Sequence, residues 1–574
     1  MNGTYSPTEE QQAVIKHPHS AYISACPGAG KTRTMVERAR LIMNQSGDRR
    51  GVAFLSFTNA AVTELETRLR AFGALPNPLF PSFIGTFDRF LWQFIISPFG
   101  HTTSIRAPRL VPDKNEWEVK PFTNARPLTL GDFDRSTGKF DTSKPKASAF
   151  DLGNKTGAYE TAALNKIKNS IADGLFDFED MRAIVKERLG QATFADTLGR
   201  ALSARFSEII VDEAQDCNPS DLEIVRWLLN SEIAVKLICD PNQSIYKFRG
   251  GVTEELTKFA EQFDKGNHLA MSGNFRSSPN ICSAIVALRA PSSSIKPDRA
   301  IGMNENVSTP IHIISYSGKS VPQKIGITFK SIIDQLGISV RDAPILASTK
   351  LSAYKAAGRP FHSPTKDSTL LLAEVVTRYH YSFLDGKRRE ALIELHKVVL
   401  KIRGKIESLA NYHVFMQQEE NLNAAWRPEI ISIANELQCR DGETADLWLA
   451  RAREVLARDL DKSLSINSRL RRNSELALRL VKPDPTSTSA RTIHSVKGLE
   501  FPAVCVVITT STAGGILKVL NGQPADDMEE DARKLYVGAS RAEKLLTIAI
   551  PRTQTPGFQT LLENNGCEVT VWHI

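Results

Sequence analysis

The stretch ACPGAGKT, Ala25–Thr32, decides the fold class of this 574-residue chain. The run SAYISA before it has the alternating-to-apolar pattern of a strand, and TRTMVERARLIMNQ after it has apolar residues at helical spacing. A glycine-rich loop between a strand and a helix lets backbone N–H groups surround a phosphate at the N-terminus of the helix. The sequence therefore predicts a phosphate-binding loop in an α/β domain.

The loop supplies each group that such a site needs. Backbone amides wrap the phosphate, a lysine reaches the β and γ oxygens, and a hydroxyl holds Mg²⁺. These parts are supplied by Gly28, Gly30, Lys31 and Thr32, and Ala25 is small, as the first position requires. A glycine-rich turn without a ligand is the alternative interpretation.

A second motif favours the phosphate site. The apolar run FSEIIV is followed by Asp212 and Glu213. A phosphate-loop enzyme needs one carboxylate for Mg²⁺ and a neighbouring one to take a proton from the attacking water. We assign the metal to Asp212 and the general base to Glu213. An acidic pair after a strand is common on protein surfaces, but the combination with the loop predicts an ATPase that uses ATP and Mg²⁺.

The composition is that of a globular protein. Hydrophobic residues make up 41% of the chain and charged residues 24%, and the absence of a run of about 18 apolar residues predicts no membrane partner. The N-terminal segment has neither a secretory nor a transit pattern, which predicts a cytoplasmic protein. A net charge of +8 is compatible with a nucleic-acid partner or with plain solubility. The seven cysteines include no C-x-x-C pair, so no zinc or iron–sulfur site is encoded at a recognisable spacing.

From about residue 5 to about residue 550 the chain resembles the superfamily 1 helicases of the UvrD/Rep/PcrA type. TEEQQAV resembles the Q motif, LSFTNAAVTELETRL resembles motif Ia, and FIGTFDRF resembles the next DNA-contacting element. The resemblance implies that Gln11, or alternatively Gln12, reads the adenine edge. Asp88 stands where the family usually has histidine. The DNA-binding residues that these motifs imply are Thr58, Asn59, Thr86 and Phe87.

The second half of the chain carries the remaining motifs. CDPNQSIYKFRGG resembles motif III, MSGNFRSSPNI motif IV, ARTIHSVKGLEFPAVCVV motif V, and DARKLYVGASRAEKLLTIAI motif VI. The resemblance implies that Gln243 senses the γ-phosphate and that Arg276 and Arg541 approach it as arginine fingers. Such fingers stabilise charge on the transferring phosphoryl group. The other nucleotide-binding residues implied are Arg33, Phe275 and Glu500, the last at the ribose.

Two aromatic residues of motif III fall where the family presents rings to DNA bases. They are Tyr246 and Phe248, with Phe248 in place of the usual tryptophan. Stacking contributes about 1–3 kcal/mol per base without selecting sequence. Packing of both rings in the core is the alternative interpretation. With His494 of motif V, these residues imply single-stranded or partly duplex DNA as the substrate, and an RNA-directed translocase is the weaker alternative.

The motifs divide the chain into four parts. We predict an α/β fold with two RecA-like P-loop NTPase domains and two mostly helical inserted subdomains, 1B and 2B. ATP bound in the cleft would pull the two RecA-like domains together, and hydrolysis would let them part. The predicted boundaries are 1–90 and 196–272 for the first RecA-like domain, 91–195 for 1B, 273–365 and 486–574 for the second, and 366–485 for 2B.

The compact build is similar to the helicase subunit of the Gabija anti-phage system, which works beside a nuclease subunit. The similarity includes a short second insert, an end soon after the last motif, and local matches at IGTFD and PNQSIYKFRGG. One hypothesis is an ATP-dependent 3′–5′ translocase or helicase on single-stranded DNA, in phage defence with a partner nuclease. The other is a DNA- or nucleotide-sensing ATPase subunit that regulates the nuclease without processive unwinding.

Overall fold

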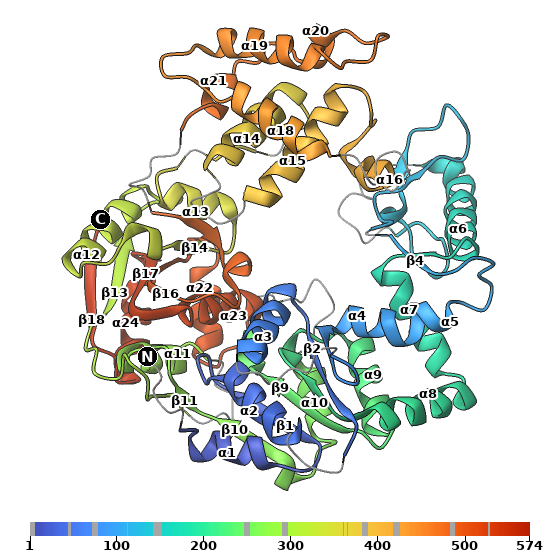
Figure 1. Cartoon of the computed structure of the whole chain (residues 1–574). Helices are drawn as coiled ribbons and strands as arrows, with labels where there is room; N and C mark the ends of the chain where they lie inside the picture. The colour runs from blue at the N-terminus through green and yellow to red at the C-terminus, as the bar shows by residue number, and fades with distance from the viewer. Residues whose placement is uncertain are drawn as a thin grey trace. The chain divides into compact units, whose positions relative to one another are not determined.

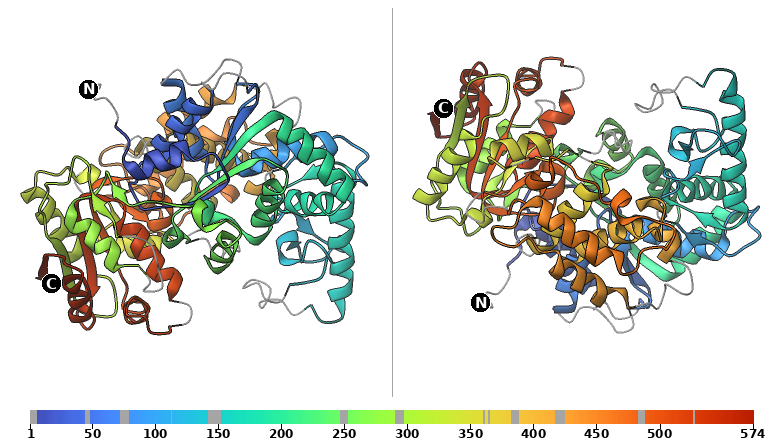
Figure 2. Two further views of the ribbon diagram at one scale, coloured as in Figure 1. Left: turned by 90° about the horizontal axis from the view of Figure 1, so that it is seen from below. Right: turned by 90° about the horizontal axis from the view of Figure 1, so that it is seen from above.

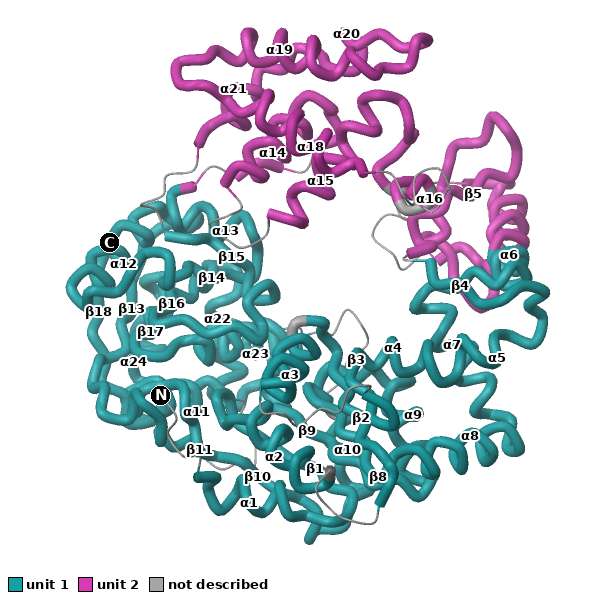
Figure 3. Tube along the Cα trace, in the orientation of Figure 1, with its two compact units in different colours: residues 1–111, 167–358, 488–574 teal, residues 112–166, 359–487 magenta. Residues whose placement is uncertain are grey.

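The structure is a computed structural model of the chain (Figure 1). Its residues form two compact units (Figure 3), one of residues 1–111, 167–358 and 488–574, the other of residues 112–166 and 359–487. The structure describes residues 6–43, 48–71, 79–111, 113–141, 152–245, 253–289, 297–359, 361–363, 365–381, 388–416, 425–482, 488–525 and 528–574.

The larger unit contains a first parallel sheet with the strand order β10-β1-β9-β8-β2-β3. Strand residues alternate between two cores, so that Ile209 and Val211 contribute to one and Ile210 to the other. Helices that cover both faces explain why these strands are apolar throughout. The strands are β1 (Ala21–Ala25), β2 (Gly51–Ser56), β3 (Phe83–Thr86), β8 (Phe206–Val211), β9 (Ala234–Cys239) and β10 (His268–Met271).

The helices around this sheet come from both ends of the first half of the chain, whose course can be followed in Figure 2. Side chains of α1 to α3 belong to one core, and side chains of α7 to α10 belong to the other. The helices are α1 (Glu9–Lys16), α2 (Lys31–Met43), α3 (Asn59–Ala71), α4 (Phe87–Leu91), α5 (Ser97–Phe99), α7 (Phe178–Leu189), α8 (Ala192–Arg205), α9 (Pro219–Leu229) and α10 (Thr253–Ala260). A π-helix, η1 (Trp92–Ile96), joins α4 to α5, and a short parallel pair is formed by β4 (Arg109–Leu110) and β7 (Leu175–Phe176).

A second parallel sheet in the same unit has the order β15-β14-β16-β17-β13-β18. Val504 and Val506 contribute to one core, and Cys505 and Val507 to the other. The strands are β13 (Ile311–Tyr316), β14 (Ile345–Ala347), β15 (Ala490–Thr492), β16 (Phe501–Val507), β17 (Ala542–Pro551) and β18 (Val569–His573). The helices are α11 (Pro279–Ala287), α12 (Lys324–Gln335), α13 (Lys350–Ala356), α22 (Ala513–Leu520), α23 (Glu529–Ala539) and α24 (Thr555–Asn564), and β11 (Gly273–Asn274) pairs with β12 (Arg299–Ala300).

These two sheets confirm the predicted fold class, α/β with two RecA-like domains. The larger unit also includes residues 91–111 and 167–195, two segments of the predicted 1B insert. The compact units therefore differ from the four-part division, whose boundaries stay a prediction. The stretch FEDMRAIVKERLG, whose apolar residues have helical spacing, forms α7, which begins with a capping box at Asp177 and Asp180.

The smaller unit is mostly helical. Its segment 359–487 packs around Trp448, which is fully buried and donates its indole N–H to Leu437 O at 2.7 Å. The stretch EALIELHKVVLKIRGKIESLANY has helical periodicity throughout, but its first helix ends at Ile402, because Gly404 adopts a φ of 77°. The helices are α14 (Ser368–Tyr381), α15 (Arg388–Ile402), α16 (Tyr412–Met416), α18 (Trp426–Glu436), α19 (Ala445–Ala457), α20 (Ile466–Arg469) and α21 (Leu476–Arg479), and the segment 112–166 adds an antiparallel pair, β5 (Glu118–Val119) and β6 (Leu128–Thr129), and most of α6 (Thr156–Ala172).

Among the described helices of both units, none combines the length and the apolar character that crossing a membrane requires.

Candidate active site

The phosphate-binding loop joins the end of β1 at Ala25 to the start of α2 at Lys31. Gly28 and Gly30 have φ values of 72° and 73°, in the left-handed region that favours glycine. A Cβ atom on Gly28 would also lie 2.5 Å from Asn274 Oδ1. Both backbone conformation and space therefore require glycine at the predicted positions.

The predicted acidic pair follows β8 at the same edge of the sheet as the loop. Asp212 N donates to Leu55 O at 2.8 Å, and this hydrogen bond holds the residue after β8 against the neighbouring strand β2. Glu213 has a φ of 55°. A left-handed conformation of a residue that is not glycine costs about 1–3 kcal/mol and occurs preferentially at functional sites. The backbone strain is thus located at the predicted general base.

The phosphate-loop lysine is paired with this base. Lys31 Nζ donates to Glu213 Oε1 at 2.9 Å, and the two side chains are 14% and 20% exposed. Burial opposes the charge on each, but the carboxylates of Glu213 and Asp212 raise the pKa of Lys31. Burial also disfavours ionised Glu213, yet Lys31 and Lys497 outweigh it and lower the pKa of Glu213 to about 2. A ligand that draws Lys31 away would therefore make Glu213 more basic.

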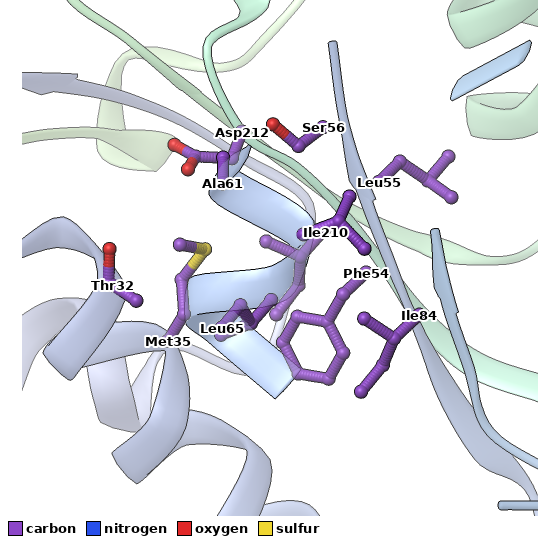
Figure 4. Close-up of a pocket in the computed structure, with 11 residues that line it drawn as sticks. Thr32, Met35, Phe54, Leu55, Ser56, Ala61, Leu65, Ile84, Ile210 and Asp212 are labelled. Carbon is purple, nitrogen blue, oxygen red and sulfur yellow. The ribbon is translucent and has the colours of Figure 1, made fainter. Parts of the chain in front are cut away.

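Asp212 and Thr32 have the oxygen atoms that Mg²⁺ prefers. Asp212 Oδ1 and the Ser56 hydroxyl are both buried, and neither has a hydrogen-bond partner within the described residues. All three residues line one small cavity between α2, α3 and the strands (Figure 4). Its other lining residues are apolar: Met35, Phe54, Leu55, Ala61, Val62, Leu65, Ile84 and Ile210. Carboxylate and hydroxyl oxygens suit a hard cation, so this donor set fits Mg²⁺, which would neutralise phosphate charge when bound.

Gln11 contacts the loop directly, whereas Gln12 does not. The Gln11 side chain is buried; its Nε2 donates to Ala29 O at 3.0 Å and its Oε1 accepts from Thr8 N at 3.1 Å. Gln12 is exposed and donates to Pro7 O at 3.4 Å. Of the two glutamines, Gln11 is therefore the one beside the nucleotide site, and its contact with adenine stays a prediction.

The predicted γ-phosphate sensor and one arginine finger contact each other. Arg541 Nη2 donates to Gln243 Oε1 at 3.1 Å, and both side chains are buried. Gln243 follows β9 of the first sheet, whereas Arg541 precedes β17 of the second. Burial and neighbouring Arg276 lower the pKa of Arg541 to about 10, so it remains charged at neutral pH. This contact joins the two RecA-like domains.

Arg276 and Phe275 connect the second domain to the loop region. Arg276 Nε donates to Glu500 Oε2 at 2.8 Å, and its Nη1 donates to Ser540 O at 2.9 Å. Phe275 N donates to Gly28 O at 2.9 Å. The remaining predicted nucleotide-binding residue, Arg33, is half-buried in the first turn of α2. The structure thus joins the two sheet-containing domains at the predicted site, through Phe275 with Gly28 and through Arg541 with Gln243.

Three polar contacts near these residues were not predicted. Gln215 Nε2 donates to Glu213 Oε2, and Gln215 Oε1 accepts from Asp240 N at 3.1 Å. Lys497 Nζ donates to Asp216 Oδ2 at 2.7 Å across the domains. Burial outweighs this pairing and raises the pKa of Asp216 to about 6. The motifs contain these residues, but 281 positions separate Lys497 from Asp216, and no local pattern indicates such a pair.

The predicted DNA-binding residues differ in accessibility. Asn59 is exposed, and Thr58, Thr86 and His494 are half-buried. Phe87 is only 1% exposed and stacks on Phe57, with ring centroids 5.4 Å apart. This placement assigns Phe87 to the core of the first domain, and its ring has no face available for a base. The other two predicted residues, Tyr246 and Phe248, lie outside the described residues.

Asp88, in the same element, is bound to neighbouring helices. Arg182 Nη2 lies 2.6 Å from Asp88 Oδ1, and Arg182 Nε lies 3.0 Å from Asp221 Oδ1. Arg182 belongs to α7 and Asp221 to α9. The aspartate at this position therefore forms an ion pair within the domain.

Together, two parallel-sheet domains, a phosphate loop, a metal-suited carboxylate and arginines from the second domain define an ATP-hydrolysing enzyme with two RecA-like domains. Comparison with protein families matches residues 7–264 to the UvrD/REP helicase N-terminal domain and residues 450–553 to the UvrD-like helicase C-terminal domain. These two matches together cover more than half of the chain. The chain belongs to the UvrD/Rep/PcrA-type helicases, and this confirms the predicted family and enzyme class.

Several characterised helicases are similar over most of the chain. The ATP-dependent DNA helicase srs2 of Schizosaccharomyces pombe is 20% identical to this chain. The match covers 98% of this chain and 73% of the length of srs2. DNA helicase II of Haemophilus influenzae is 22% identical, and the match covers 92% of this chain and 81% of that helicase. The ATP-dependent DNA helicase PcrA of Staphylococcus aureus is 21% identical, and the match covers 94% of this chain and 82% of PcrA.

Replacing the base should separate binding from hydrolysis. Glu213→Gln keeps the size of the side chain and an acceptor for Lys31 but removes the proton acceptor. We expect steady-state ATP hydrolysis to fall by about 100-fold or more, because a positioned general base contributes about 10²–10⁴-fold. Equilibrium ATP binding should stay within a few fold. Glu232→Gln is the matched control, since Glu232 is exposed and has a φ of 58°. Normal hydrolysis by Glu213→Gln would place the base elsewhere.

Arg541→Ala tests the arginine finger. Turnover should fall by about 10³-fold or more, because such a finger acts on charge that develops in the transition state. The KM for ATP should change by only a few fold, as measured by steady-state kinetics. Arg552→Ala, at an exposed arginine of the same domain, is the control. Loss of ATP binding with intact turnover at saturation would remove this assignment.

Proposed function

We propose that the protein is an ATP- and Mg²⁺-dependent translocase that moves 3′ to 5′ along single-stranded DNA and unwinds duplex DNA. The observation that carries this proposal is the contact of Arg541 with Gln243, which brings an arginine of the second domain to the predicted γ-phosphate sensor of the first. Closure of the cleft and assembly of the hydrolytic site are then one event. Relatives named DNA helicase II and PcrA support DNA as the substrate.

The residues of the cleft have separate roles in this proposal. Lys31 would bind the β and γ oxygens and release Glu213, which would then accept the proton of the attacking water. Thr32 and Asp212 would hold Mg²⁺. Arg541, and Arg276 beside it, would stabilise charge on the transferring group. Parting of the domains after hydrolysis would convert this chemistry into a step along the strand.

DNA binding is proposed at the accessible residues of the first domain and of motif V. Thr58 and Asn59 follow the carboxyl end of β2, and Thr86 is the last residue of β3. His494 lies in the 3₁₀ turn Ile493–Val496. Phe87 is left out of this set because its ring is buried. Contacts to the phosphate backbone make binding strongly salt-dependent and weakly sequence-selective. Tyr246 and Phe248 remain proposed stacking residues.

Steady-state ATP hydrolysis by the purified chain, with and without single-stranded DNA, tests the proposal. We expect DNA to stimulate hydrolysis strongly, with an effect that weakens as salt rises, because counterion release contributes to binding. Lys31→Ala, which removes the phosphate-loop lysine, is the negative control for hydrolysis. Equal stimulation by single-stranded RNA would favour the RNA-directed alternative, and a rate that DNA does not change would contradict a self-sufficient motor.

We also propose a cytoplasmic location and a role in phage defence beside a separately encoded nuclease. The similarity of the compact build to the Gabija helicase subunit supports this part of the proposal. The regulatory alternative differs in one respect, since it requires ATP hydrolysis to control the nuclease without processive unwinding.

Affinity purification of the tagged chain from its native host, followed by strand-displacement assays, separates these functions. A defence role with a partner predicts a stable complex with a nuclease at fixed stoichiometry. Strand displacement by that complex would support the helicase function, and ATP-dependent nuclease control without displacement would support the regulatory alternative. A monomer that displaces strands efficiently and retains no nuclease would contradict the partner.

A further inference from the structure

A buried carboxylate at the end of β9 receives donors from both domains. Asp240 is 1% exposed. Its Oδ1 accepts from Asn242 N at 3.0 Å, and its Oδ2 accepts from Gln243 Nε2 at 2.9 Å and from the Tyr536 hydroxyl at 2.9 Å. Asn242 and Gln243 belong to the first domain, whereas Tyr536 lies on α23 of the second. The carboxylate therefore joins α23 to the predicted γ-phosphate sensor.

Tyr536 is buried between Asp240 and Arg289, and its side chain interacts with both. Its side chain is 1% exposed, and the Arg289 guanidinium lies 5.9 Å from the ring centroid. Arg289 is itself paired with Asp298, and both of these side chains are buried. Burial raises the pKa of Tyr536, so the phenol keeps its proton and remains a donor at neutral pH.

The partners of Gln243 fix the orientation of its side-chain amide. A carboxylate can only accept, and a guanidinium can only donate. Because Nε2 faces Asp240 and Oε1 faces Arg541, turning the amide over would break both hydrogen bonds. The position of Asp240 thus decides where the carbonyl end of Gln243 points.

We propose that Tyr536 is a positioning residue that couples the docking of α23 to the orientation of Gln243. The inference rests on the proposed function and deepens it, because it names the contact through which the second domain reaches the sensor. When α23 is docked, Tyr536 and Gln243 share Asp240 Oδ2, and Gln243 presents its carbonyl to Arg541. When the domains part, Asp240 loses the phenol and Gln243 loses the guanidinium together.

Tyr536→Phe removes the hydroxyl and keeps the ring. A hydrogen bond to a charged acceptor accounts for about a tenfold change in an equilibrium or a rate. We therefore expect kcat for DNA-stimulated ATP hydrolysis to fall by about 10-fold, with the KM for ATP within a few fold. The matched control is Tyr316→Phe. Tyr316 is also fully buried and donates to Ile508 O at 2.7 Å, but this hydrogen bond lies entirely within the second domain.

A double mutant separates positioning from general stability. If Tyr536 acts through Gln243, then Tyr536→Phe should reduce kcat little further in a Gln243→Ala background. Losses that multiply, or an equal loss of kcat in Tyr316→Phe, would assign the effect to packing and overturn the proposal. A wild-type kcat in Tyr536→Phe would also overturn it.

Hydrogen exchange provides a readout that does not need turnover. With a non-hydrolysable ATP analogue and Mg²⁺, we expect the phosphate loop and α23 to gain protection together in the wild-type chain and in Tyr316→Phe. In Tyr536→Phe the loop should gain protection while α23 does not. Equal protection of α23 in all three chains would contradict the coupling. An absence of hydrolysis in the wild type, with this exchange pattern intact, would reject the proposed function and leave the role of Tyr536 supported.

Discussion

A buried guanidinium needs an acceptor for each N–H group that it takes out of water, and this constraint on Arg541 organises the cleft. Its own domain satisfies part of it, since Arg541 donates to Val537 O at 3.1 Å and to Ser540 Oγ at 2.8 Å. The first domain supplies Gln243. An arginine so placed is partly desolvated before any substrate arrives, and electrostatic stabilisation by it costs little reorganisation. The meeting of the two sheets is therefore also the assembly of a site for developing negative charge.

The carboxylates of the cleft are balanced by lysines from both domains. Lys31 pairs with Glu213 inside the first domain, and Lys497 of the second pairs with Asp216. Removing one partner of a buried ion pair is costly, but exchanging it for another charge of the same sign is not. A bound phosphate could therefore replace Glu213 as the partner of Lys31. Lys497 would stay paired with Asp216. The proton affinity of Glu213 would then rise when the substrate is in place, which would link binding to the first step of the proposed reaction.

The sequence predicted the parts of the site that follow from local patterns. The phosphate loop and Asp212–Glu213 each follow a short apolar strand, and both lie where those strands end. Family resemblance added Arg541, which no local pattern could place beside Gln243, 298 residues away. It could not reveal the Tyr536–Asp240 contact, because a tyrosine on the buried face of an amphipathic helix has the same pattern whether its hydroxyl forms a hydrogen bond or not. For Phe87 the motif predicts a contact with DNA, but the fold buries its ring against Phe57, which the motif alone does not reveal.

Asp88 shows how the fold accommodates a departure from the family pattern. A carboxylate in an element that faces DNA would repel phosphate, and the usual histidine would not. Here Arg182 lies between Asp88 and Asp221. Burial lowers the pKa of Arg182, but the two carboxylates outweigh it and raise the pKa, so the guanidinium stays charged. The single guanidinium offsets part of the negative charge of the two carboxylates and attaches α4 to α7 and α9. With the side chain of Asp88 engaged in this way, any contact of this element with DNA is left to the accessible side chains of Thr86 and Arg89 and to the backbone. Contacts of such groups with phosphate carry no sequence information.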